Sequence, residues 1–296
     1  MATEQIDPRY VDLDAWSSNE IIAAIYEGQL EAAAAVRGAL GAIAAAVEDA
    51  VPALQRGGRL VYAGAGTSGR IGVQDGSELP PTFDWSPNRL VFAMAGGLGA
   101  LVRSSEDAED NEYAGAQVIV DAKVGANDVV IGVAASGTTP FTIGALRTAS
   151  AAGAVTIAIA NNAGAPLFDV ARHHILAETG SEVIAGSTRM KAGTAQKIIL
   201  NLISTTIMVK MGRVYRGLMV DMRARNAKLK RRAQRIVSEI VGCSESEAAR
   251  HLEETKGELK EAILVALGAE PDKAAQLLER NGQNLRAAMA SLRGNG

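Results

Sequence analysis

The chain has 296 residues, 48% hydrophobic and 21% charged, a composition typical of a globular protein with one large domain or a core and a small appendage. Its formal net charge of −3 gives no electrostatic reason to expect nucleic acid or an anionic membrane as a partner, and its single cysteine, Cys243, excludes an internal disulfide and a multi-thiolate metal site. The polar amino terminus has no signal-peptide pattern and no apolar run reaches the ~18 residues of a membrane span, so we expect a cytoplasmic protein.

The first predicted element is a helix over 19–56, where Asn19 is a suitable cap and apolar residues recur near helical spacing until Gly57 and Gly58. Short apolar runs then alternate with helical segments. The predicted strands are 59–63, 89–94, 128–133, 154–159 and 174–177. The helices predicted between and after them are 70–75, 99–122, 140–152, 165–171 and 192–237.

This alternation predicts an α/β fold with a doubly wound, parallel five-stranded sheet covered by helices on both faces. We expect residues 1–56 to pack on this core as a helical segment, 57–235 to form the sheet domain, and 236–296 to form a small helical module. In that module five residues recur 25 positions later, which indicates two copies of a helix–turn–helix unit: Ala249, Leu252, Glu254, Gly257 and Ala262 match Ala274, Leu277, Glu279, Gly282 and Ala287.

The loop after the first strand, GAGTSG at 64–69, matches the dinucleotide fingerprint G-x-G-x-x-G. A dinucleotide site also needs an acidic residue at the end of the second strand, to bind the ribose. That strand ends FAMAGG at 92–97, with no acid. No lysine follows the glycines in the arrangement of a P-loop either. The loop therefore belongs to neither class.

The same loop carries hydroxyls, Thr67 and Ser68, at a helix start, and a second loop of this kind, ASGTTP, follows the third strand at 135–140. Hydroxyls and backbone N–H groups at a helix start suit a compact phosphate monoester. The alternative is that both loops are tight turns with helix caps, since Ser, Thr and Gly favour these too. Two such loops at one sheet edge favour a phosphate ligand.

Five blocks closely resemble the N-acetylmuramic acid 6-phosphate etherases, members of the sugar isomerase (SIS) superfamily: GAGTSGR, DGSELPPTF, AASGTTP, EVIAGSTRMKAGTAQK and LMVDMRARNAKLKRR. The resemblance covers nearly the whole chain. It implies a cytoplasmic lyase of cell-wall sugar recycling that cleaves the D-lactyl ether at carbon 3 of its sugar phosphate, giving N-acetylglucosamine 6-phosphate and D-lactate. It also implies a homodimer that uses no metal and no cofactor.

An ether is a poor electrophile, so its elimination needs an acidified carbon 2 proton and two positioned acid–base groups. By resemblance, Glu78 protonates the departing lactate, and Glu109 transfers the carbon 2 proton and promotes water addition. The alternative for Glu109 is a solvated acidic helix face over 106–112, in which Glu106 and Glu112 are its neighbours.

The remaining site candidates fall into two groups. The predicted phosphate ligands are Thr67, Ser68, Gly69, Ser136, Gly137, Thr138 and Thr139. Glu182, Ser187 and Lys191 precede or begin a helix, where they bind substrate or, alternatively, cap that helix and pair at a subunit contact. No chemistry is expected of His173, His174 or His251.

Three positions depart from the family pattern. Relatives commonly carry a basic residue where this chain has Thr138, a loss of charge that Arg70 or Lys191 would have to replace. Relatives also have Cys and Gly in place of Leu79 and Asp84. Two other functions remain open: a non-catalytic sugar-phosphate regulator, which needs no paired acids, and an aldose–ketose isomerase, which releases no lactate. The acidic balance disfavours a DNA-binding regulator.

Overall fold

The computed structural model describes residues 1–103, 106–222 and 226–294, which form two compact units. The first unit comprises Met1–Ser77 and Pro87–Ser204, and the second comprises Glu78–Ser86 and Thr205–Gly296. These units divide the chain at different places from the segments 1–56, 57–235 and 236–296 expected from composition. The reason is that one helix, α7 (Lys191–Lys210), passes from the first unit into the second.

The first unit is built on the predicted five-stranded sheet, and all neighbouring strands pair in parallel. Its strands are β1 (Leu60–Gly64), β2 (Leu90–Met94), β3 (Val129–Val133), β4 (Val155–Ala160) and β5 (His173–Leu176). Their order is β2-β1-β3-β4-β5. The central strands are buried along their whole length, which explains their continuous apolar runs. The doubly wound fold class is therefore confirmed.

Strand order changes direction at β1. The chain goes from β1 outward to β2 and then returns to the other side of β1 for β3. The strands are in register, so Gly64, Met94 and Val133 end at the same edge of the sheet. In open parallel sheets, ligands bind at such a reversal, beyond the carboxyl ends of the strands. Here that place is between β1 and β3.

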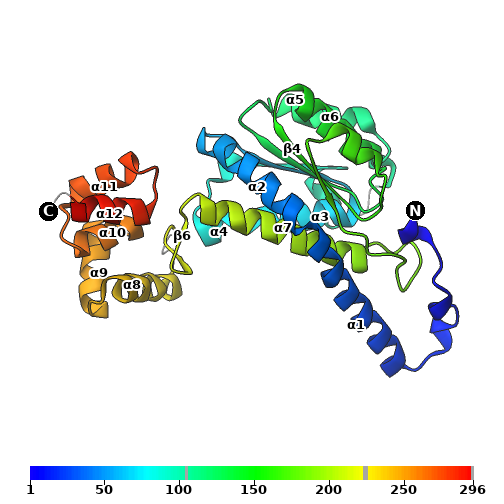
Figure 1. The fold of residues 1–296 in the computed structure, drawn as a ribbon, viewed down its shortest axis with the longest axis horizontal. Helices are drawn as coiled ribbons and strands as arrows, with labels where there is room; N and C mark the ends of the chain where they lie inside the picture. The colour runs from blue at the N-terminus through cyan, green and yellow to red at the C-terminus, as the bar shows by residue number, and fades with distance from the viewer. Residues whose placement is uncertain (104–105, 223–225, 295–296) are drawn as a thin grey trace. The chain divides into compact units, whose positions relative to one another are not determined.

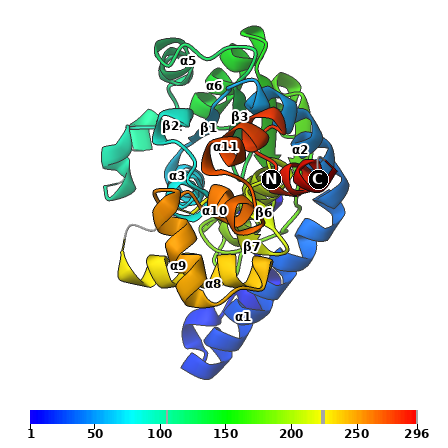
Figure 2. The same ribbon diagram turned by 90° about the vertical axis from the view of Figure 1, so that its left-hand side faces the viewer.

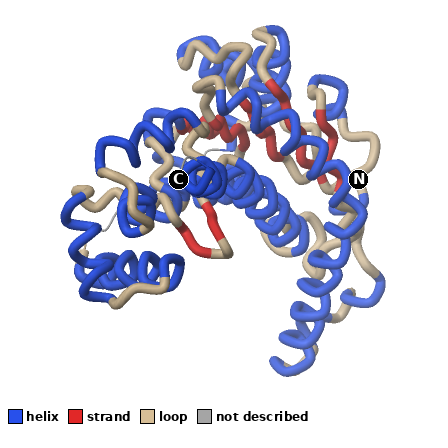
Figure 3. Tube along the Cα trace, turned by 60° about the vertical axis from the view of Figure 1, so that its left-hand side comes forward, coloured by secondary structure: helices blue, strands red, loops and turns tan. Residues whose placement is uncertain are grey.

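Helices cover both faces of the sheet (Figures 1 and 3). On one face lie α5 (Glu112–Asp121), α6 (Pro140–Ala151) and the 3-10 helix η8 (Pro166–Val170). On the other lie α2 (Leu40–Gln55) and α3 (Gly66–Ser77). At the amino ends of β1 and β3, Arg59 and Asp128 form an ion pair of 2.7 Å that fixes the two strands to each other.

The predicted helix 19–56 is interrupted. Helix α1 (Ser18–Ala35) and α2 are joined by a 3-10 turn, η4 (Val36–Ala39), and the cap of α1 is Ser17 rather than Asn19. By length and composition the stretch 18–55 is apolar enough to cross a membrane. However, α2 buries Ile43, Val47 and Leu54 within the first unit, so α2 is a core helix of this fold.

Two other predicted helices are wrong in extent. The segment 99–122 forms short 3-10 turns, η6 (Leu98–Leu101) and η7 (Glu106–Ala108), before α5 begins at a cap on Asn111. The segment 192–237 forms α7, a hairpin of β6 (Val214–Tyr215) and β7 (Leu218–Met219), and then α8 (Ala227–Val241). Gly212 has positive φ just after α7, which ends that helix, and Gly217 has positive φ in the turn between β6 and β7.

The second unit contains the hairpin, α8 and the helices of the predicted repeat (Figure 2). Helices α9 (Glu245–Glu254) and α10 (Leu259–Ala266) form the first copy, and α11 (Pro271–Arg280) and α12 (Leu285–Gly294) form the second. Gly257 and Gly282 occupy matching turns with positive φ, as the 25-residue repeat requires. The remaining short helices are η1 (Ala2–Glu4), η2 (Pro8–Tyr10), η3 (Leu13–Ala15), α4 (Leu79–Phe83) and η5 (Pro87–Arg89).

Candidate functional site

The two hydroxyl-rich loops lie next to each other at the reversal of strand order. One follows β1 and leads into α3, and the other follows β3 and leads into α6. Helix α3 begins directly against its strand, because a Cβ at Gly69 would come within 2.8 Å of the carbonyl oxygen of Gly64. The starts of both helices therefore face the ligand-binding edge of the sheet, where their N–H groups favour an anion.

Glu109 lies between these two helix starts. Its carboxylate oxygen Oε1 is 2.8 Å from the position that a Cβ of Gly66, the first residue of α3, would occupy. Its backbone carbonyl accepts a hydrogen bond of 3.0 Å from the N–H of Phe141, in the first turn of α6. The side chain is half-buried. The turn after η7 thus brings this glutamate to the predicted phosphate loops, as an acid–base role requires.

Replacing Gly66 with alanine is expected to displace the Glu109 carboxylate, because the new Cβ would overlap Oε1. A misplacement of this kind lowers the rate of a reaction that uses Glu109 by up to about 100-fold. Gly66 has φ +49°, so stability falls by roughly 1 kcal/mol as well. The measurements are kcat and the urea midpoint.

The matched control for that substitution is Gly97→Ala. Gly97 also has positive φ, but nothing lies within 4 Å of its added Cβ. It should lose stability without losing activity. Equal losses of activity in the two variants would contradict the placement of Glu109.

Ser68 is buried and donates a hydrogen bond of 2.9 Å to Oε1 of Gln196 on α7. Gln196 in turn donates a 2.9 Å hydrogen bond to Oδ1 of Asn161, which follows β4. Because the single hydroxyl proton of Ser68 is used in this way, Ser68 supports the loop and has no proton left for a phosphate oxygen. Two features of the sequence point to these partners of Ser68, although neither predicts the contacts. Asn161 directly follows a predicted strand, and Gln196 lies in the EVIAGSTRMKAGTAQK block that resembles the etherases.

In the second loop, the backbone N–H and the hydroxyl of Thr138 both donate to Oγ of Ser136, at 3.2 and 3.0 Å. Gly137 has φ +71° and packs against Ala165, so this turn needs glycine. Thr139 is the N-cap of α6, but its side chain makes no capping hydrogen bond. The hydroxyl of Thr139 therefore does not cap α6.

Arg70 and Lys191 are the two cations expected to compensate for the missing positive charge at Thr138. Both side chains bind other groups of the protein instead. Arg70 donates to the carbonyl oxygens of Ala100 and Leu101 at 3.0 to 3.2 Å. Lys191 is 4% exposed, and its ammonium lies 2.6 Å from a carboxylate oxygen of Glu31 on α1. The loops thus offer neutral donors and helix N-termini to an anion.

Glu182 caps α7. It is fully buried, and its carboxylate accepts hydrogen bonds from the N–H groups of Lys191 and Ala192 at 2.8 and 2.9 Å. Burial raises the pKa of Glu182, although both N–H donors oppose that shift. Its contacts are those of the capping alternative. Ser187 is half-buried in the segment just before α7.

The two acidic residues of the DGSE block, Asp75 and Glu78, lie in different surroundings. Asp75 is buried inside α3, where its carboxylate accepts hydrogen bonds from Tyr62 at 3.0 Å and from Ser204 at 3.1 Å, and burial raises its pKa. Glu78 follows the end of α3, is exposed and starts α4 in the second unit. Asp84 has φ +49°, a left-handed conformation that explains the glycine expected there from the family resemblance.

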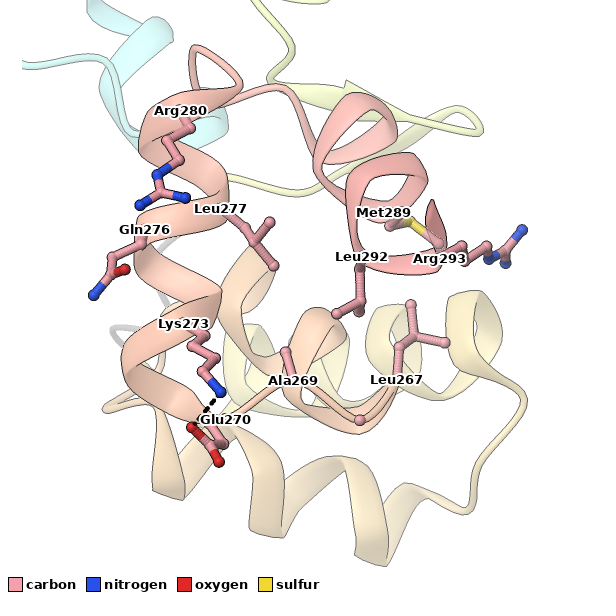
Figure 4. Close-up of a pocket in the computed structure, with 11 residues that line it drawn as sticks. Leu267, Ala269, Glu270, Lys273, Gln276, Leu277, Arg280, Met289, Leu292 and Arg293 are labelled. Atoms are coloured by element: carbon pink, nitrogen blue, oxygen red, sulfur yellow. Dashed lines mark ion pairs between the residues drawn. The ribbon is translucent and has the colours of Figure 1, made fainter. Parts of the chain in front are cut away.

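The second unit contains a groove of about 700 Å³ (Figure 4). In the figure Leu267, Leu277 and Leu292 point toward one another, and Glu270 pairs with Lys273 at 3.0 Å. The lining residues are Leu267, Gly268, Ala269, Glu270, Lys273, Gln276, Leu277, Arg280, Met289, Leu292 and Arg293. None of the predicted site residues lines it.

Comparison with known proteins agrees with this fold. The family model of the glucokinase regulatory protein N-terminal SIS domain matches residues 42–150, and that of the SIS domain matches 112–205. The N-acetylmuramic acid 6-phosphate etherase of Deinococcus radiodurans is 49% identical over 97% of this chain and 94% of its own length. The chain belongs to the N-acetylmuramic acid 6-phosphate etherase family. The etherase of Halalkalibacterium halodurans is 44% identical over 99% of this chain and 98% of its own.

Among solved structures, a phosphoheptose isomerase from Francisella tularensis aligns with 66% of this chain and 100% of its own, at 20% identity and a TM-score of 0.47. The two etherase relatives align with 97% and 99% of this chain, so the family includes the helical repeat as well as the sheet. The two SIS matches together cover residues 42–205, which contain both hydroxyl-rich loops, Glu78 and Glu109.

Proposed function

We propose that the protein is a carbon–oxygen lyase that cleaves the D-lactyl ether of N-acetylmuramic acid 6-phosphate, giving N-acetylglucosamine 6-phosphate and D-lactate in cell-wall amino-sugar recycling. Membership of the etherase family over nearly the full chain supports this assignment. The structural observation that carries it is the position of the Glu109 carboxylate, beside Gly66 and between two helix starts that suit a phosphate. The enzyme acts in the cytoplasm as a homodimer.

The phosphate binds where α3 and α6 begin. Thr67 and Thr139 are half-buried at these starts and offer hydroxyls, and Gly69 and Gly137 let the backbone approach closely. Two helix N-termini directed at one dianion supply favourable electrostatics without a nearby cation. Ser136, Thr138 and Ser187 complete the polar lining, while Ser68, Glu182 and Lys191 hold the surrounding elements in place.

The chemistry needs one base and one acid. In the open-chain sugar, the carbon 1 carbonyl acidifies the carbon 2 proton, which Glu109 removes. The electron pair forms the carbon 2–carbon 3 double bond, and the carbon 3–oxygen bond breaks. Glu78 supplies the proton that the departing lactate oxygen takes. Once Glu109 has released the carbon 2 proton to solvent, it deprotonates the water that adds to carbon 3 and passes the proton on to carbon 2, while Glu78 regains its proton from solvent. Oxidation states balance without an external electron acceptor.

The test is incubation of the purified chain with N-acetylmuramic acid 6-phosphate in deuterated water. We expect D-lactate release at a catalytic rate, with one deuterium at carbon 2 of the N-acetylglucosamine 6-phosphate formed. Bound sugar phosphate without lactate release would show a regulator, and a rearranged sugar phosphate with its lactyl group intact would show an isomerase. Either result would overturn the proposal.

A further inference from the structure

Glu78, the proposed acid, belongs to the same compact unit as the helical repeat. It directly follows α3 in the sequence, but Glu78–Ser86 groups with Thr205–Gly296 in the second unit. The side chain of Glu78 is exposed and makes no capping hydrogen bond on α4. The position of its carboxylate is therefore set by the backbone of the segment that follows it.

That segment is short and is anchored by buried side chains. Leu79 and Phe83 of α4 are buried, and Trp85 just after it is 1% exposed. The N–H of Trp85 donates to the carbonyl oxygen of Leu79 at 3.5 Å, so the two ends of the segment are bonded to each other. Helix α4 has five residues and is only about 7 Å long. A shift at its carboxyl end is therefore transmitted to Glu78.

Arg213 holds the carboxyl end of α4. Its Nη1 atom donates to the carbonyl oxygens of Phe83, at 2.7 Å, and Asp84, at 3.2 Å. Its guanidinium carbon lies 5.5 Å from the centre of the Trp85 ring, within the range of a cation–π contact. The last carbonyl groups of a helix have no partner within the helix, so Arg213 supplies a donor that α4 itself cannot.

The side chain of Arg213 is held in turn by the helical repeat. The Oδ2 atom of Asp221 lies 3.7 Å from Nη1 of Arg213 and 2.7 Å from Nζ of Lys260, on α10. Lys260 is 4% exposed and also donates to the carbonyl oxygen of Gln283, in the turn between α11 and α12, at 2.7 Å. Burial lowers the pKa of Lys260, and Asp221 opposes that shift. Lys260 thus fixes the carboxylate that faces Arg213.

The backbone at Arg213 is fixed as well. A Cβ at the preceding residue, Gly212, would be 3.2 Å from the Cα of Asn284 and 3.3 Å from the carbonyl oxygen of Gln283. The carbonyl oxygen of Arg213 accepts a hydrogen bond of 3.1 Å from the N–H of Val220, just after the hairpin. Both the main chain and the side chain of Arg213 are therefore placed by the second unit.

We propose that Arg213 is a positioning residue for the acid Glu78. The helical repeat holds Arg213 in place through Lys260 and Asp221. This inference rests on the proposed function, because it concerns the protonation of the departing lactate. The three supporting residues lie outside 42–205, the part of the chain that the two SIS matches cover. The region beyond the SIS domain thereby takes part in the lyase reaction.

The test compares Arg213→Gln with Glu78→Gln in deuterated water, by lactate release and by deuterium exchange at carbon 2 of unreacted substrate. A displaced acid slows the departure of lactate but leaves Glu109 to exchange the carbon 2 proton. We expect Arg213→Gln to lower lactate release by about 10- to 100-fold. The ratio of exchange to release should rise, as it does for Glu78→Gln. An unchanged ratio in Arg213→Gln overturns the positioning role, because a merely structural loss lowers both rates by the same factor.

Two further variants test the same contacts. Arg213→Lys keeps a cation opposite Asp221 and a donor for the carbonyl of Phe83, so it should recover part of the lactate release. Asp221→Asn keeps the size of the side chain but removes the charge that faces Arg213, so it should raise the ratio by less than Arg213→Gln. If Arg213→Gln does not fold, Asp221→Asn decides the question, and an unchanged ratio there overturns the proposal.

The matched control is Arg216→Gln. Arg216 is exposed in the turn between β6 and β7, and its guanidinium carbon lies 5.6 Å from the centre of the Tyr215 ring. Arg216→Gln should change neither rate, and an equal rise of the ratio in both arginine variants would overturn the specific role of Arg213. Absence of lactate from the wild type, measured first, identifies a failure of the proposed function itself. A ratio that does not rise in Glu78→Gln removes the acid role and the inference with it.

Discussion

Glu109→Gln is expected to reduce D-lactate release by about 10²- to 10⁴-fold, the usual contribution of a positioned acid–base group. Glutamine keeps the size of the side chain beside Gly66 and leaves the backbone hydrogen bond from Phe141 intact, but it cannot accept the carbon 2 proton. Deuterium uptake at carbon 2 should therefore fall together with lactate release. Both are measured in one reaction, by lactate assay and by mass spectrometry of the sugar phosphate.

The control for Glu109 is its acidic neighbour Glu112, at the first position of α5. Its carboxylate pairs with Arg147 on α6 and is 46% exposed, so it belongs to the outer face of the two helices. Glu112→Gln should retain near-wild-type activity. If Glu109→Gln exchanges deuterium at the wild-type rate, another group takes the carbon 2 proton and the central assignment of the site is wrong.

The strands could be predicted to within one or two residues because burial on both faces forces continuous apolar runs, as in Val129–Val133. The structure of the segment before α5 could not be predicted in this way. Its acids gave the pattern of a solvated helix, but Asn111 caps α5 and starts it only at Glu112. That late start leaves Glu109 in a turn, with its carboxylate beside Gly66 at the start of α3, so the error in secondary structure falls at the proposed base.

The site residues show the same division. Hydroxyl and glycine spacing located both loops, because helix starts at strand ends need those residue types. Residue spacing did not reveal that the hydroxyl of Ser68 donates its hydrogen bond to Gln196, because these two residues are 128 positions apart. Nor did spacing distinguish a substrate ligand from a cap at Glu182, since both roles place a carboxylate before a helix. Long-range contacts decide such roles, and one chain's sequence pattern does not encode them.

Glu78→Gln is expected to separate the two proton transfers. Lactate release should fall by about 10²- to 10⁴-fold, because the departing oxygen loses its proton donor. Glu109 remains, so unreacted substrate recovered from deuterated water should still gain deuterium at carbon 2. The measurement is the ratio of exchange to lactate release, which should rise well above that of the wild type.

Glu253→Gln, an exposed carboxylate of the second unit, is the matched control and should change neither rate. Urea unfolding should leave Glu78→Gln close to wild type, since Glu78 is exposed and its side chain forms no capping hydrogen bond on α4. If exchange and lactate release fall by the same factor, then carbon 2 deprotonation itself depends on Glu78. The acid and base assignments would then have to be exchanged or merged, even though both glutamates would still belong to one site.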